Sequence, residues 1–412
     1  MTADNPVKDL FAQLPEMAAA LQTVDDDSTR IFVEFVSDTI CRAYDHSETT
    51  FVAWTDVTVP EYLLYAMDNV IPAKLAMIFG FSTAVGLASE MLDEGDGLGV
   101  PRDSCSFNRA IVGGASIGAF PKADMAFAAA YCSIEAKSFD MACRLASVPL
   151  FTLGMAYHRD AAGKKYYIEE LKQMVRFLEE RTGKGMDPKR LRDVMLIGRE
   201  TQELYNEIYE LRSKTVPCPT KMNKSFEMYA MTMWSQGTEK GLEYARALRD
   251  NLKQRAKDGY SPCSPEKHRV LWMHTYPFYD PGLMDWLETE LNVNSPVDTN
   301  NIIFNPATNL IDPENPLESV AEVWLGRPNV TTGPDSELIS YWIKIAKEAR
   351  IDAVIHFAQF GCRIYTAGVN MYKDAFKKAG LPYLGLPAEP GDPANYSASE
   401  LKYKLESFIQ SL

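Results

Sequence analysis

The sequence predicts an α/β protein with two lobes, each built on a parallel sheet, joined by a helical middle segment. Short apolar runs without polar alternation are typical of parallel strands that helices cover on both faces. Longer amphipathic stretches lie between these runs, which favours alternating strands and helices. Between two strand-bearing regions, roughly 100 residues have the apolar spacing of helices.

Seven apolar runs have the length and composition of buried strands. In chain order, the expected strands are Thr50–Trp54, Ala123–Tyr131, Val148–Leu153, Val270–His274, Ile302–Phe304, Asp352–Ala358 and Tyr383–Leu386.

The middle of the chain has helical periodicity. Its apolar spacing predicts a helix from Lys164 that ends at Gly183. Asp187 is the expected N-cap of a second helix, with Pro188 at its first position. We therefore expect an N-terminal helical segment at 1–44, a first α/β lobe at 45–160, a helical connecting region at 161–264, and a second α/β lobe with a C-terminal helix at 265–412.

Charge and hydropathy exclude several classes of protein. The chain has 42 Lys and Arg against 56 Asp and Glu, a net charge of −14. This acidity argues against nucleic acid or an anionic membrane surface as the main partner. The N-terminal segment lacks the basic region and apolar core of a signal peptide, and no apolar stretch reaches the about 18 residues of a membrane span. We therefore expect a soluble, cytoplasmic protein.

Common catalytic motifs are missing from the sequence. The run Gly113–Gly118 superficially resembles a dinucleotide-binding loop, but no strand feeds into it, so the match is weak. The five histidines lack zinc-site spacing, and there is no Gly-x-Ser-x-Gly elbow. The seven cysteines of a chain without an export signal favour reduced thiols or metal ligands over a disulfide framework.

Three cysteines are the main candidates for chemistry. Cys132 and Cys362 follow expected strands in different lobes, and Cys105 lies in a polar segment. Ligands bind outside the carboxyl ends of parallel strands, so two such ends are expected to converge on one cleft. Three thiolates with one open position suit an iron–sulfur cluster that binds substrate directly. By spacing alone, three small buried residues remain the alternative.

The chain resembles the 2-hydroxyacyl-CoA dehydratase and benzoyl-CoA reductase family, in particular the D-component of 2-hydroxyglutaryl-CoA dehydratase. The resemblance covers about residues 50–412 in consistent order. The segments that carry it are Ser104–Arg109, the strand ending at Cys132, Met186–Leu191, His268–His274, Asp352–Cys362, Gly380–Gly385, Gly391–Tyr396 and the last helix, Leu401–Ile409.

The resemblance implies two flavodoxin-like, Rossmann-like lobes and one [4Fe-4S] cluster held by Cys105, Cys132 and Cys362. It also implies an iron site left open for water or the thioester oxygen, and a separate ATP-dependent iron–sulfur activator that supplies a low-potential electron. That electron makes a ketyl radical on the acyl-CoA and so permits loss of the 2-hydroxyl. The implied activity is that of an (R)-2-hydroxyacyl-CoA dehydratase, an anaerobic lyase that works as a dimer with a related subunit or with itself.

One segment departs from the family pattern. Family dehydratases carry a hydroxyl-rich run before a Pro-x-Glu-Leu motif, whereas Trp54–Glu61 has Val57 in place of a serine expected to contact substrate. We expect Thr55 and Asp56 to point into the cleft and to handle a proton or a substrate hydroxyl. The alternative is that Asp56 caps the following helix, a role that asparagine would also fill.

Four further residues are candidates for the site. His274 is a candidate catalytic residue, and Tyr276, Gln359 and Arg109 are candidates for substrate binding. His274 and Tyr276 lie at and just after an expected strand end, and Gln359 precedes Cys362. For His274, Tyr276 and Gln359, the alternative is a purely structural hydrogen-bonding role in a loop.

Other functions remain open at this point. An aromatic acyl-CoA reductase subunit belongs to the same family, and so does a double-cubane reductase, which would need about six cysteine ligands. Cys41, Cys143, Cys218 and Cys263 are interpreted as structural, although the sequence leaves open whether one of them adds a ligand. The non-enzyme alternative is a two-lobed scaffold or ligand-binding subunit.

Overall fold

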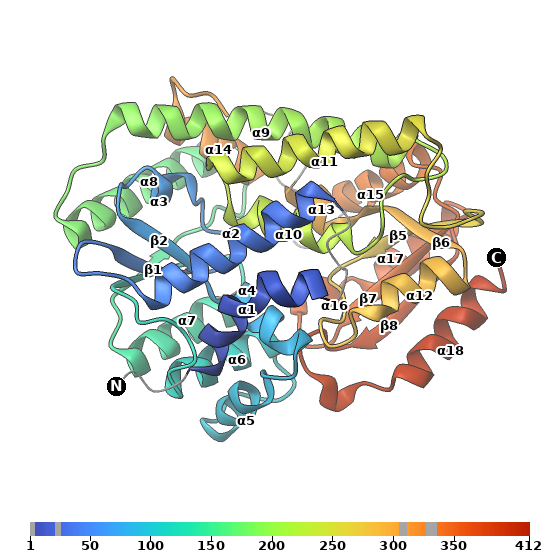
Figure 1. Ribbon diagram of the computed structural model, residues 1–412, viewed down its shortest axis with the longest axis horizontal. Helices are drawn as coiled ribbons and strands as arrows, with labels where there is room; N and C mark the ends of the chain where they lie inside the picture. Colours follow the sequence, from blue (N-terminus) through green and yellow to red (C-terminus); the bar gives the residue numbers. More distant parts are fainter. Residues whose placement is uncertain (1–4, 21–25, 305–310, 327–335) are drawn as a thin grey trace.

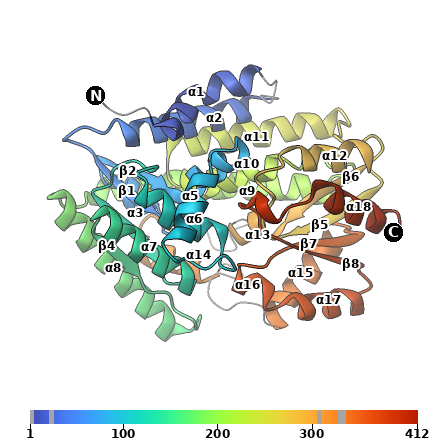
Figure 2. The same ribbon diagram turned by 90° about the horizontal axis from the view of Figure 1, so that it is seen from below.

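The computed structural model describes residues 5–20, 26–304, 311–326 and 336–412, which form two lobes side by side (Figure 1, Figure 2). Each lobe is built on a four-stranded sheet in which every neighbouring pair of strands is parallel. The structure therefore confirms the predicted fold class. Across the described ranges, no helix is both long enough and apolar enough to span a membrane.

The first sheet has the strand order β2-β1-β3-β4. Its strands are β1 (Phe51–Thr55), β2 (Val70–Lys74), β3 (Met125–Ala129) and β4 (Leu150–Leu153). In the register of the sheet, Ala53 pairs with Pro72 on one side and with Met125 on the other. The helices of this part are α1 (Pro6–Ala20), α2 (Asp27–Tyr44), α3 (Tyr62–Tyr65), α4 (Leu75–Ala84), α5 (Ser89–Gly97), α6 (Ser106–Ser116) and α7 (Ser133–Ala146).

The second sheet repeats this arrangement with the order β6-β5-β7-β8. Its strands are β5 (His268–Met273), β6 (Val293–Asp298), β7 (Ala353–Gln359) and β8 (Tyr383–Ala388). Its helical elements are α12 (Gly282–Glu290), α13 (Thr299–Phe304), α14 (Pro316–Gly326), α15 (Ser336–Glu348), α16 (Arg363–Thr366), α17 (Val369–Lys378), the 3-10 turn Pro393–Asn395 and α18 (Ala398–Ile409).

Four helices connect the two sheets: α8 (Ala161–Thr182), α9 (Pro188–Lys214), α10 (Lys224–Trp234) and α11 (Glu239–Lys257). The predicted ends of the first two are confirmed. Gly183 ends α8 with a φ of 68°, and the Asp187 side chain accepts a hydrogen bond from the Lys189 backbone at the start of α9. Helix α9 contacts both α3 and β6, and Figure 1 shows it running along both lobes.

Two strands differ from the sequence-based expectation. The expected strand Ile302–Phe304 is wrong, because these residues belong to α13, where Asp298 accepts a hydrogen bond from the Asn301 backbone. The strand in this region is β6, and the sequence pattern also misses β2. Both are edge strands that contain a proline, Pro72 in β2 and Pro296 in β6. An edge strand tolerates proline because one of its sides makes no backbone hydrogen bonds to a neighbouring strand.

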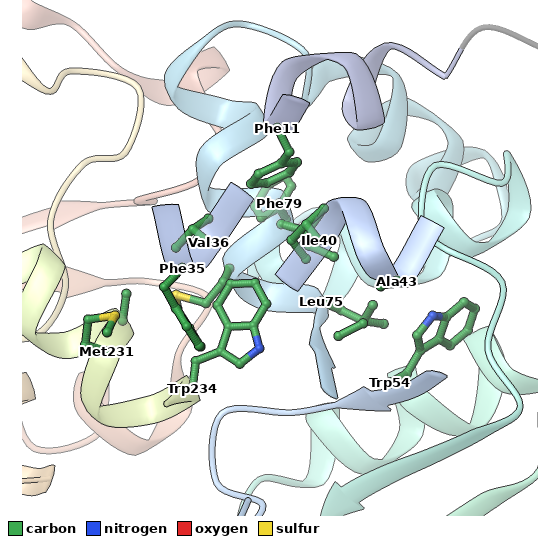
Figure 3. Close-up of a cluster of buried hydrophobic side chains, with 14 of the residues drawn as sticks. Phe11, Phe35, Val36, Ile40, Ala43, Trp54, Leu75, Phe79, Met231 and Trp234 are labelled. Carbon is green, nitrogen blue, oxygen red and sulfur yellow. The ribbon is translucent and has the colours of Figure 1, made fainter. Parts of the chain in front are cut away.

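An apolar cluster joins the N-terminal helices to the first sheet (Figure 3). Among its members are Phe11 of α1, Val36 of α2, Phe79 of α4, Trp234 of α10 and Trp54 of β1. Trp234 packs edge-on against Phe35 with ring centroids 6.0 Å apart. Its indole Nε1 donates to the Pro72 carbonyl at 3.0 Å, so the same residue covers the edge strand and supports its backbone.

A second apolar cluster crosses from one lobe to the other. It contains Leu153 of β4, Met174 of α8, Leu271 of β5 and Trp324 of α14. The Trp324 indole Nε1 donates to the Thr58 carbonyl at 2.6 Å, which attaches α14 to the first lobe. The two lobes therefore share a core.

The glycines at Gly113–Gly114 lie inside α6 and serve helix packing. A Cβ on Gly113 would lie 1.9 Å from the Met91 carbonyl oxygen of α5, and a Cβ on Gly95 would lie 2.3 Å from the Arg109 carbonyl oxygen. The backbones of α5 and α6 approach so closely that neither position accepts a side chain. This close packing of α5 and α6 explains why the run is rich in glycine, and no bound phosphate is needed to explain it.

We predict that Gly113→Ala destabilises the protein by about 3 kcal/mol, because the added methyl group collides with backbone and cannot rotate away. Denaturant unfolding measures the effect. Gly97→Ala is the matched control, since a Cβ at this exposed position meets nothing within 4 Å, and it should leave stability within about 0.5 kcal/mol of wild type or raise it slightly. Equal stabilities of the two variants would contradict the packing argument.

Candidate functional site

A cavity of about 160 Å³ lies between the lobes, at the carboxyl ends of β3 and β7. Cys105 and Cys132 reach it from the first lobe, and His274, Gln359 and Cys362 reach it from the second. This location agrees with the rule that parallel sheets bind ligands at the carboxyl ends of their strands. Five of the nine residues named from the sequence therefore lie around one cavity.

The three cysteines of the cavity occupy equivalent local positions. Cys105 precedes α6, Cys132 precedes α7 and Cys362 precedes α16, each as the residue before the first helical turn. Backbone N–H groups of those first turns favour the thiolate form of each sulfur: Asn108 for Cys105, Ile134 and Glu135 for Cys132, and Ile364 and Tyr365 for Cys362. Such N–H groups stabilise a negatively charged sulfur without adding a cationic side chain.

Burial nevertheless raises the pKa of each thiol. The pKa of Cys362 rises to about 12, and that of Cys105 lies well above its ordinary value. Negative charge on neighbouring thiols adds to the effect, because Cys362 raises the pKa of Cys105 and Cys132 raises that of Cys362. Without a bound cation, these thiols therefore keep their protons at neutral pH, and a metal centre would supply the charge that stabilises them as thiolates.

His274 is held in one orientation at the end of β5. Its backbone has a φ of 71°, a conformation that costs a non-glycine residue about 1–3 kcal/mol. The Nδ1 lies 3.2 Å from the Phe357 carbonyl, which can only accept, so Nδ1 carries the proton. Burial lowers the pKa of His274 to about 3, so the ring is neutral with Nε2 as its acceptor.

Thr55 and Asp56 lie outside the described lining of the cavity. Asp56 is fully buried, and both of its carboxylate oxygens accept hydrogen bonds. Oδ1 accepts from the backbones of Thr58 and Val59 at 2.6 and 3.0 Å, and Oδ2 accepts from the backbone of Ala129 at 2.5 Å. Thr55 donates from Oγ1 to Glu61 at 3.1 Å. Asp56 thus ties the turn after β1 to the end of β3.

Tyr276 and Arg109 also lie outside the described lining. Tyr276 stacks on Trp272 in the second lobe, with ring centroids 5.5 Å apart. Arg109 is buried and joins the lobes, since its Nε lies 2.8 Å from Asp96 and its Nη1 lies 2.8 Å from Asp392. Both side chains are engaged in packing or ion pairs beside the cavity.

The structure adds residues to the cavity that the sequence reasoning missed. Glu135 lines it three positions after Cys132, and Asn108 lines it three positions after Cys105. Burial raises the pKa of Glu135 to about 8, with a further contribution from the charge of Asp56. Each lies three residues after a cysteine at the start of a helix, and residues three apart share one face of a helix. This spacing could have predicted both residues from the sequence.

The remaining cysteines lie elsewhere. All seven are free thiols, and Cys41, Cys143, Cys218 and Cys263 are absent from the described lining of the cavity. Cys143 belongs to the apolar cluster of the first lobe, and Cys263 donates from its sulfur to the Val293 carbonyl at 3.3 Å. These contacts agree with a structural role for Cys143 and Cys263.

Two parallel-sheet lobes with three thiols at their shared cavity define a class of two-lobed α/β proteins that present a thiol cluster between the lobes. Residues 56–412 match the family model described as 2-hydroxyglutaryl-CoA dehydratase, D-component, so the chain belongs to this family. The resemblance stated from the sequence is thereby confirmed.

Characterised relatives are subunits of dehydratases and of a reductase. The chain is 20% identical over 293 residues to the alpha subunit of (R)-2-hydroxyglutaryl-CoA dehydratase from Acidaminococcus fermentans, covering 68% of this chain and 58% of the relative. It is 20% identical to the (R)-2-hydroxyisocaproyl-CoA dehydratase alpha subunit of Clostridioides difficile, over 87% of this chain and 89% of the relative. It is 23% identical to a benzoyl-CoA reductase subunit of Thauera aromatica, over 84% of this chain and 85% of the relative.

We predict that Asp56→Asn lowers the free energy of unfolding by about 1–3 kcal/mol, because an amide nitrogen would face the Ala129 N–H where Oδ2 now accepts. Asp160→Asn is the control: Asp160 caps α8 through Oδ1 alone, at 2.8 Å from the Gly163 nitrogen, and an amide oxygen can replace it. Thermal unfolding of both variants measures the difference. Wild-type stability of Asp56→Asn with turnover reduced about 100-fold would instead support a proton-transfer role.

Proposed function

We propose that this protein is the iron–sulfur subunit of a 2-hydroxyacyl-CoA dehydratase-like lyase that acts on an acyl-CoA thioester. The observation that carries the proposal is the convergence of Cys105, Cys132 and Cys362 on one cavity between the lobes. Each of these thiols lies at the start of a helix, where backbone N–H groups favour the thiolate. Membership of the dehydratase family supports the same reaction class.

The donor set fits a [4Fe-4S] cluster better than a single ion. Among the described residues, no three His, Cys, Asp or Glu side chains lie close enough together to hold one metal ion. A cluster places its own iron and sulfide atoms between the thiolates, so its ligands stand farther apart than those of one ion. Three thiolates would leave one iron without a protein ligand. The double-cubane alternative has less support, since the other four cysteines lie away from the cavity lining that the structure describes.

When bound, such a cluster supplies a Lewis-acidic iron for the thioester oxygen and a path for one electron. The chain itself supplies water exclusion and hydrogen bonds. The Phe and Tyr side chains of the described lining enclose the cavity from both lobes: Phe107, Tyr131, Tyr229, Phe278 and Tyr365. Glu135 keeps a proton on its carboxyl group at neutral pH, because its pKa is raised to about 8, and can donate it to a substrate oxygen.

The lining also favours an uncharged acyl group. Of the described residues around the cavity, none is a lysine or arginine, and His274 is neutral. A second carboxylate on the acyl chain would enter without a cationic partner, which is costly for a buried charge. We propose a branched aliphatic or aromatic acyl group in preference to a dicarboxylic one.

We propose two partners from what the relatives are called. Each relative is named as one subunit of its enzyme, and in both dehydratases it is the alpha subunit, so this chain would pair with a related subunit, or with itself. A separate ATP-dependent iron–sulfur activator would supply the electron, because reduction of an unconjugated thioester needs a lower potential than ordinary ferredoxins provide. The second candidate function is an aromatic acyl-CoA reductase, which the likeness to the benzoyl-CoA reductase of Thauera aromatica and the aromatic lining favour.

We predict about four irons and four acid-labile sulfides per chain after anaerobic reconstitution, and loss of most of this content in Cys105→Ser, Cys132→Ser and Cys362→Ser. Iron and sulfide analysis with the visible absorbance measures it. Cys143→Ala is the control and should retain the iron, because Cys143 lies in the core of the first lobe. Full iron content in all three serine variants would exclude this cavity as the site of the cluster. About eight irons per chain in wild type would indicate the double cubane.

We also predict that phenyllactyl-CoA binds at least about tenfold more tightly than 2-hydroxyglutaryl-CoA, since an unpaired buried carboxylate costs about 1.4 kcal/mol or more. Calorimetric titration of the reconstituted protein with both thioesters measures the ratio. Free coenzyme A serves as the control for binding that does not involve the acyl group. Tighter binding of the glutaryl ester would contradict the proposed uncharged acyl group.

A further inference from the structure

A chain of hydrogen bonds runs from the second lobe to the sulfur of Cys105. Gln359 is the last residue of β7, and its Nε2 lies 3.3 Å from Cys105 Sγ and 2.5 Å from Glu389 Oε1. Glu389 directly follows β8. The same Oε1 accepts from Ser106, the first residue of α6, at 3.1 Å from its backbone nitrogen and 2.6 Å from its Oγ. Glu389 and Gln359 are both buried.

The hydrogen bonds of Ser106 determine which end of the Gln359 amide faces the sulfur. A backbone N–H can only donate, so the Oε1 of Glu389 that receives it is an acceptor, whatever the protonation of the other carboxyl oxygen. An acceptor at 2.5 Å requires the NH₂ group of Gln359 and excludes its carbonyl oxygen. The NH₂ group has two N–H bonds, and the one that Glu389 does not use is available to Cys105 Sγ.

The surrounding backbone leaves little freedom for this arrangement. A Cβ on Gly361 would lie 2.7 Å from the Cys105 nitrogen, and a Cβ on Gly391 would lie 2.7 Å from Ser106 Oγ. Both segments of the second lobe therefore press directly on the start of α6. The buried amide of Gln359 is held in place by its hydrogen bond to Glu389.

We propose that Glu389 is a positioning residue that keeps an N–H of Gln359 directed at the Cys105 sulfur, and that this hydrogen bond raises the reduction potential of the centre bound there. The proposal rests on the proposed function, because it requires an iron–sulfur centre on Cys105. A hydrogen bond to a ligating sulfur withdraws electron density from it and favours the reduced state, and such bonds are among the features that set cluster potentials.

The test compares anaerobically reconstituted wild type with Gln359→Met and Glu389→Leu in a redox titration monitored by electron paramagnetic resonance. Gln359→Met keeps the length of the side chain but has no donor, and Glu389→Leu removes the acceptor that orients the amide. We expect both to shift the one-electron equilibrium about tenfold toward the oxidised state, a potential about 59 mV more negative. Glu389→Gln should restore the wild-type potential, because its amide oxygen can still accept from Gln359 and Ser106.

Ser104→Ala is the matched control, since Ser104 lies beside Cys105 but donates to the Pro101 carbonyl at 2.5 Å. Its potential should equal that of wild type. Full iron content with an unchanged potential in Gln359→Met overturns the proposal and leaves the proposed function intact. Absence of iron from wild type overturns both. If Glu389→Leu does not fold, the potential of Gln359→Met alone tests whether the hydrogen bond to Cys105 raises the reduction potential.

Discussion

Arg109 is buried between two carboxylates, Asp96 in its own lobe and Asp392 in the other, each 2.8 Å from the guanidinium. A buried guanidinium is strongly unfavourable unless its charge is paired and hydrogen-bonded, so the first lobe is stable in this form only while the turn after β8 lies against α6. That turn begins just after Glu389, and α6 begins just after Cys105. This ion pair, one helical turn along α6 from Cys105, thus helps to maintain the contact between the lobes at the cavity.

The wall of the cavity in the first lobe is acidic. Glu135 faces the cavity, and behind it Glu61 and Asp56 share one buried lysine, Lys74, whose Nζ lies 2.7 Å from Glu61 Oε1 and 2.7 Å from the Asp56 carbonyl. Burial raises the pKa of Glu61 to about 7, and Lys74 counteracts the shift. Three carboxyl groups with one cation disfavour further negative charge, which agrees with the uncharged acyl group that we propose.

The sequence-based reasoning found the four central strands and the edge strands β4 and β8, but it missed the edge strands β2 and β6. Central strands are buried on both faces and read as apolar runs, as in β3 and β7, whereas β6 carries Asn294, Ser295 and Pro296 and yet is buried. Its polar groups find partners in distant segments, such as the Thr220 carbonyl that accepts from Asn294 at 3.0 Å. A pattern of neighbouring residues cannot reveal partners of this kind.

The sequence by itself determined the fold class, the helix ends at Gly183 and Asp187, and the position of Cys132 and Cys362 after strands. Each depends on residues only a few positions apart, because caps and strand ends are local features. Only the tertiary structure decided that Asp56 binds the backbone of Ala129 and that Glu389 holds Gln359 beside Cys105. These contacts join residues 30 to 254 positions apart, and two lobes must pack before burial and hydrogen bonding select them.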